Sequence, residues 1–112
     1  MKSTLKTAYD FEMDKAKMKY AQGRFEACFK HLERAHILGQ KFTFAHTMSH
    51  YWMLKVGLKI YDRKEVLGQL IRIVAAIVFS KVWVPKGNTG GSNVSAIMSL
   101  PIPDDLREYL DD

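Results

Sequence analysis

Cysteine is nearly absent from this chain of 112 residues, which has a single one, Cys28. One cysteine cannot form an internal disulfide, as is usual for proteins of a reducing compartment. The N-terminal stretch also lacks the unbroken apolar segment of a secretory signal, because Asp10, Glu12 and Asp14 interrupt it. We therefore expect a cytoplasmic protein whose fold depends on its core.

Proline is scarce as well, and all three prolines follow residue 84. Sustained heptads and low-complexity tracts are missing, and the β-branched residues 73–78 would have no partner strand. The balance of 47% hydrophobic and 26% charged residues is that of a globular protein. The composition excludes collagen-like and disordered chains and predicts a single helical domain over residues 1–112.

Positive charge is in excess, at +5, but it is not concentrated into a basic run. Residues 1–64 carry 13 Lys and Arg against 6 Asp and Glu, whereas residues 65–112 carry 4 against 6. The lysines of the first half alternate with acidic and apolar residues, which is typical of a solvated helix face rather than of a surface that reads bases. We expect no nucleic-acid partner.

Apolar residues recur every three or four positions, which is the period of the α-helix. This spacing predicts three helices in the first half of the chain, over residues 4–22, 24–39 and 43–57. Ser3 is the expected N-cap of the first helix, and Gly23 its expected end.

A capping box formed by Asp62 and Glu65 predicts that a fourth helix begins near residue 63. This helix is apolar almost all round, so we expect it at the centre of the domain. Gln69, Arg72 and Lys81 interrupt the apolar run, which argues against a membrane span. Gln69 and Arg72 will need polar partners if they are buried, and the candidates are Glu65, Asp104 and the Asn/Thr-rich loop.

The chain becomes rich in proline and glycine after residue 84, and residues 105–110 are predicted to form a short last helix. The predicted fold class is therefore all-α. Antiparallel helical hairpins would pack as a four-helix bundle-like domain, completed by the Pro/Gly-rich loop and the short last helix.

Four histidines lie within 20 residues, at His31, His36, His46 and His50. His46 and His50 are four residues apart and lie on one helix face, a spacing that can chelate a metal ion. Glu33 and His36 form an E-x-x-H pair on the preceding helix, and an antiparallel turn would bring the two pairs together. Three imidazoles and a carboxylate suit a divalent zinc, nickel or copper ion. The alternative is that these histidines only form hydrogen bonds between helices.

Other polar residues are weaker candidates for a functional site. His31 lies about 160° from Glu33 on a helical wheel, so it is expected to make a different contact. Arg34 cannot coordinate a metal ion, and Arg72 is a cation on the most apolar helix. The remaining candidates are the loop residues Asn88, Thr89, Gly90 and Gly91. Their glycines suggest an anion-binding nest, but the order of the phosphate-loop motif is missing, so an ordered structural loop is favoured.

The sequence resembles a small bacterial family known only as a domain of unknown function. The matching stretches are residues 31–40 (HLERAHILGQ), 46–54 (H-x-x-x-H-x-W-M-L), 65–73 (EVLGQLIRI) and 84–95 (VPKGNTGGSNVS), followed by PIPDDL. The resemblance covers nearly the whole chain beyond the first helix. It implies that the histidines and the Gly-Asn-Thr-Gly-Gly loop are characteristic of the family, but it supplies no mechanism.

Two functions remain open from the sequence. The first is a non-enzymatic module that binds another protein or associates with itself through exposed side chains such as Trp52 and Met53. The second is a divalent-metal-binding protein built on the histidine cluster. No Ser-His-Asp or Cys-His arrangement predicts an enzyme.

Overall fold

The computed structural model describes residues 1–79 and 101–110, with the side chains of residues 76–79 excepted. The described part contains helices and no strand, so the predicted all-α fold is confirmed. The five helices are α1 (Ser3–Ala21), α2 (Phe25–Gly39), α3 (Thr43–Lys59), α4 (Arg63–Phe79) and α5 (Asp104–Leu110).

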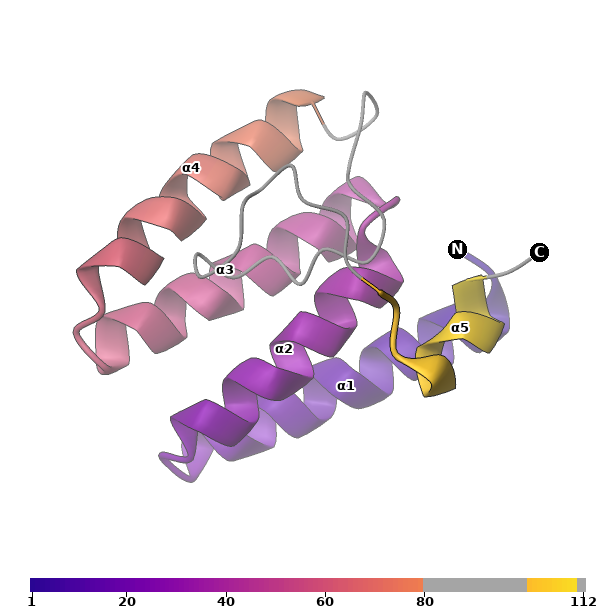
Figure 1. Cartoon of the computed structure of the whole chain (residues 1–112), viewed down its shortest axis with the longest axis horizontal. Helices are drawn as coiled ribbons and strands as arrows, with labels where there is room; N and C mark the ends of the chain where they lie inside the picture. Colours follow the sequence, from indigo (N-terminus) through magenta and orange to yellow (C-terminus); the bar gives the residue numbers. More distant parts are fainter. Residues whose placement is uncertain (80–100, 111–112) are drawn as a thin grey trace.

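The four long helices follow one another across the molecule in chain order, and α5 lies beside the start of α1 (Figure 1). Helix α2 packs against α1 on one side and α3 on the other, whereas α4 packs against α3. The core contains fully buried side chains from the two central helices and α5, including Cys28, Leu32, Leu38, Met53 and Leu106. Burial of these apolar groups is the main stabilising contribution to a fold of this kind.

Among the described helices the expected central position of the fourth helix is wrong, because α4 packs against α3 alone whereas α2 packs against both α1 and α3. The physical reason is that the polar residues of α4 point into the molecule. Glu65 and Gln69 are buried, whereas Leu67, Ile71 and Val74 are each more than half exposed. Its polar face therefore turns inward, which a pattern of apolar residues alone does not predict.

Two helix starts test the predicted caps. The backbone amide of Glu65 donates to Oδ1 of Asp62 at 3.0 Å, so the N-cap of α4 is confirmed. The reciprocal half of the predicted capping box is wrong, because the backbone amide of Asp62 donates to the carbonyl of Gly57 and the Glu65 carboxylate accepts from Gln69 instead. The N-cap prediction for Ser3 is wrong, since Ser3 is the first residue of α1 and Lys2 occupies the cap position. Gly23 takes a φ of +73° after the end of α1, as expected for a glycine that ends a helix.

A close approach between three helices shapes the corner where α2 meets α3. A Cβ atom added at Gly39 would lie 2.9 Å from Cβ of Ala45 and 2.9 Å from the ring of Tyr9. The Tyr9 hydroxyl donates to the buried carbonyl of Ala45 at 2.8 Å. Gly39 thus allows the end of α2 to approach the start of α3, directly beside His46.

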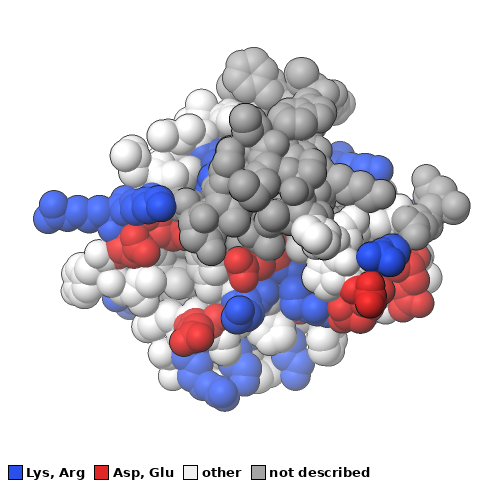
Figure 2. Space-filling model, in the orientation of Figure 1, with Lys and Arg blue, Asp and Glu red and all other residues white. Residues whose placement is uncertain are grey.

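Acidic and basic side chains are interspersed on the face of the molecule in Figure 2. This mixture agrees with the alternation of charge along the sequence. Within the described residues, none of the helices has the length and apolar character needed to span a bilayer.

Candidate metal centre

Three of the four histidines converge in the interior, one from α2 and two from α3. His36 lies in the last turn of α2, and the α2–α3 corner brings it opposite the first turns of α3. His46 and His50 are one helical turn apart on α3 and point the same way. The exposed fractions of His36, His46 and His50 are only 2%, 6% and 2%.

Each of the three imidazoles points its Nε2 atom toward the cluster. Nε2 of His46 lies 3.0 Å from Nε2 of His36 and 3.0 Å from Nε2 of His50. One nitrogen from each ring lies within 4.8 Å of the other two. The ring centroids form a nearly equilateral triangle with sides of 4.7, 4.6 and 4.8 Å.

Hydrogen bonds alone do not satisfy this arrangement. An imidazole Nε2 presents either one proton or one lone pair in the ring plane. Nε2 of His46 faces two nitrogens, so it can form a well-aligned hydrogen bond with only one of them. A cation at the centre can instead accept the lone pairs of all three nitrogens.

The buried rings of His46 and His50 are neutral at physiological pH. Burial lowers the pKa of His46 to about 4. Burial, together with the neighbouring His46, lowers the pKa of His50 to about 3. Neutral imidazole is the form that binds metal ions, so these two rings do not have to lose a proton before they bind a cation.

Gln69 and Glu65 support His50 from the inward face of α4. Nδ1 of His50 lies 2.5 Å from Oε1 of Gln69, and Nε2 of Gln69 donates to Oε2 of Glu65 at 2.5 Å. The sequence indicated Glu65 as a partner for Gln69, and this pairing is confirmed. The contact with His50 was missed, because the sequence showed only that Gln69 would need a polar partner if it were buried.

The structure does not place Glu33 among the three clustered histidines. It lines an open cleft of about 500 Å³, together with Val56, Asp62 and Glu65. Glu33 lies one turn before His36 on α2, and its role as an oxygen ligand stays a prediction.

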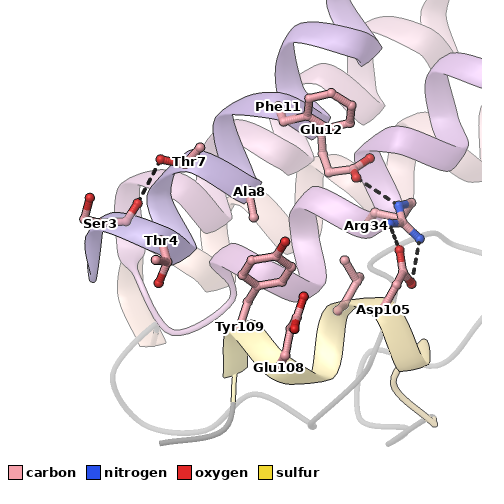
Figure 3. Close-up of a pocket in the computed structure, with 11 residues that line it drawn as sticks. Ser3, Thr4, Thr7, Ala8, Phe11, Glu12, Arg34, Asp105, Glu108 and Tyr109 are labelled. Atoms are coloured by element: carbon pink, nitrogen blue, oxygen red, sulfur yellow. Dashed lines mark hydrogen bonds and ion pairs between the residues drawn. The ribbon is translucent and has the colours of Figure 1, made fainter.

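His31 and Arg34 belong to a different cluster, and for His31 its position on α2 predicted a separate contact. Nδ1 of His31 lies 2.8 Å from Oε1 of Glu12, and Nε of Arg34 lies 3.1 Å from Oε2 of the same carboxylate. Arg34 also pairs with Asp105 of α5 (Figure 3). The hydrogen bond to Asp105 raises the pKa of Arg34 and lowers that of Asp105.

The remaining candidates are Arg72, Cys28 and the loop. Arg72 is partly buried, and burial lowers its pKa while Glu65 opposes this effect. Burial raises the pKa of Cys28 to about 11, so the thiol packs in the core as a neutral group. Asn88, Thr89, Gly90 and Gly91 lie outside the described residues.

The fold and the site define an all-α protein with a buried cluster of three histidines. The chain belongs to a family described as a protein of unknown function (DUF3703), whose family model matches residues 3–110. The family resemblance predicted from the motifs is thereby confirmed. No curated protein matches the chain. No solved structure matches it either.

Proposed function

We propose that this protein binds one divalent transition-metal ion, namely zinc, nickel or copper, through Nε2 of His36, His46 and His50. The observation that carries the proposal is the convergence of the three Nε2 atoms in a buried volume. Tetrahedral coordination with Zn–N bonds of about 2.0–2.1 Å requires nitrogens roughly 3.3 Å apart. Two of the three nitrogen separations, at 3.0 Å, are within a few tenths of an ångström of this value. All three ligand nitrogens lie within 4.8 Å of one another, so the third separation, between His36 and His50, is at most 4.8 Å.

Three protein ligands leave a fourth coordination position for an oxygen ligand. Neutral imidazoles do not compensate the charge of a divalent ion, so a nearby carboxylate is favoured. We propose Glu33 for this position because it precedes His36 by one turn. Glu33→Gln would then weaken binding without abolishing it, whereas His46→Ala would remove a ligand from the centre of the cluster.

Titration of the untagged protein with zinc tests the proposal. The metal content after purification is measured by elemental analysis, and calorimetry then compares the wild type with His46→Ala and His31→Ala. His31→Ala is the matched control because His31 contacts Glu12 outside the cluster. We expect one ion per chain in the wild type and control. His46→Ala should lose more than the roughly 10–100-fold that removal of an outer partner costs.

A wild-type protein that takes up no zinc, nickel or copper would contradict the proposal. Equal affinities of the His46→Ala and His31→Ala variants would contradict it too. In either case the cluster would serve only as a set of contacts between helices.

We also propose that α4 provides an association surface, because its outer face carries an exposed apolar row. Leu67, Leu70, Ile71 and Val74 are between 47% and 62% exposed, and such a contiguous row is typical of an interaction surface. Met53, which the sequence suggested for this role, is fully buried, while Trp52 is partly buried. Sedimentation of the wild type and Ile71→Lys tests the proposal, since a wild-type monomer at high micromolar concentration would overturn it.

A further inference from the structure

A chain of two buried hydrogen bonds connects the histidine cluster to α4. It runs from Nδ1 of His50 through the side-chain amide of Gln69 to the carboxylate of Glu65. Gln69 has no exposed surface, and Glu65 is 8% exposed. The chain starts from Nδ1 of His50, the ring nitrogen other than the Nε2 atom that faces His46.

The carboxylate of Glu65 determines which way the Gln69 amide points. A carboxylate accepts hydrogen bonds and does not donate them, so it pairs with the NH₂ group of the amide. The carbonyl oxygen of Gln69 therefore faces His50. Because this oxygen only accepts, Nδ1 of His50 must carry the ring proton.

The position of that proton determines what His50 presents to the cluster. A neutral imidazole has a single ring proton, so protonation at Nδ1 leaves a lone pair at Nε2. Nε2 is the atom that lies 3.0 Å from Nε2 of His46. Without the amide, the proton could occupy Nε2 and block the nitrogen that a metal ion needs.

We propose that Gln69, oriented by Glu65, is a positioning residue of the metal centre that holds His50 as the Nδ1-protonated tautomer. This inference rests on the proposed function of the cluster. It also explains why the inward face of α4 carries two polar side chains, Glu65 and Gln69, whereas its apolar side chains are exposed. Outer partners of this kind fix the ring orientation and the tautomer of metal-binding histidines.

Two measurements on the same variants test the role of Gln69. Long-range ¹H–¹⁵N NMR of the metal-free protein identifies which nitrogen of His50 carries the proton. Zinc titration then gives the affinity. Gln69→Leu removes the amide, Glu65→Gln removes only the group that orients it, and Gln40→Leu is the control. Gln40 is also a buried glutamine, and its Oε1 atom has no hydrogen-bond partner among the described residues.

We expect an Nδ1-protonated His50 in the wild type and in Gln40→Leu. Gln69→Leu should shift the proton toward Nε2 and lower the zinc affinity about 10–100-fold with the stoichiometry unchanged. Glu65→Gln should give a smaller change in the same direction, and it provides the test if Gln69→Leu does not fold.

Three outcomes would overturn the inference, and they differ from one another. An Nε2-protonated His50 in the wild type would contradict the tautomer assignment. Variants that are less stable but keep the tautomer and the affinity would show that Gln69 only packs. A wild type that binds no metal would overturn the proposed function itself and, with it, the role of Gln69.

Discussion

At the scale of single residues, burial of the histidine cluster disfavours protonation of its rings, so the stability of the protein should depend on pH. Unfolded histidine has a pKa near 6.5, whereas burial lowers the pKa of His46 to about 4 and that of His50 to about 3. Between these values the unfolded chain binds more protons than the folded one. The contribution of these two histidines to the stability of the metal-free protein is thus complete above about pH 6.5 and is lost as the pH falls.

We expect urea denaturation in the presence of a chelator to show this loss between pH 7 and pH 5. His46 and His50 each contribute up to about 1.4 kcal/mol per pH unit. In His46→Gln, one of these groups no longer titrates, so its profile should be shallower. A free energy of unfolding that does not change between pH 7 and pH 5 would contradict the burial of neutral rings.

The buried Glu12 carboxylate depends on its two partners for stability. It is 5% exposed and accepts from both His31 and Arg34. Arg34→Leu leaves this buried carboxylate with one partner, which should cost about 1–3 kcal/mol. Asp105→Asn removes only the exposed partner of Arg34, so it should lower the free energy of unfolding by no more than about 1 kcal/mol. Equal losses in chemical denaturation would argue against this ranking.

At the scale of secondary-structure elements, the angle between α2 and α3 determines whether His36 reaches the other two rings. Gly39 is the residue that permits the close approach, since an added Cβ would lie 2.9 Å from Ala45 and from Tyr9. These neighbours belong to a packed corner that also contains the Tyr9 hydrogen bond to Ala45. The corner and the site are therefore coupled.

Gly39→Ala should destabilise the protein by about 1–3 kcal/mol, the usual cost of overpacking, and should weaken metal binding through the displaced His36. Gly57→Ala is the matched control. Its added Cβ would meet mainly Cγ2 of Val66, at 3.2 Å, a side chain that can move. A Gly39→Ala variant as stable as Gly57→Ala would show that the corner has more room than described.

The helices were predictable because their signals are local. Apolar spacing placed the long helices within a few residues, and the side chain of Asp62 capped α4 as its sequence indicated. The pairing of His46 with His50 followed from helical spacing alone. The inward direction of Gln69 and Glu65 was not predictable, because it depends on a histidine of another helix and overrides the apolar pattern of α4.

At the scale of the whole molecule, the proposed centre joins three helices. His36 comes from α2, His46 and His50 from α3, and their support from α4. An ion that binds all three rings binds only the folded chain, so its binding free energy adds to the stability of the fold.

Zinc should therefore raise the melting temperature of the wild type. At about 100 times the dissociation constant the gain is about 2.7 kcal/mol, which corresponds to roughly 10 °C for a domain of this size. A chelator should reverse the shift, and His50→Ala should show none. A zinc-dependent shift of the same size in His50→Ala would place the ion elsewhere.

The most direct test of the central claim is the position of the metal ion itself. Crystals grown with zinc and measured at its absorption edge reveal the ion by anomalous scattering. We predict one peak per chain, about 2.0–2.1 Å from Nε2 of His36, His46 and His50. Crystals with no peak at this position, or with peaks only at exposed surface residues, would contradict the account.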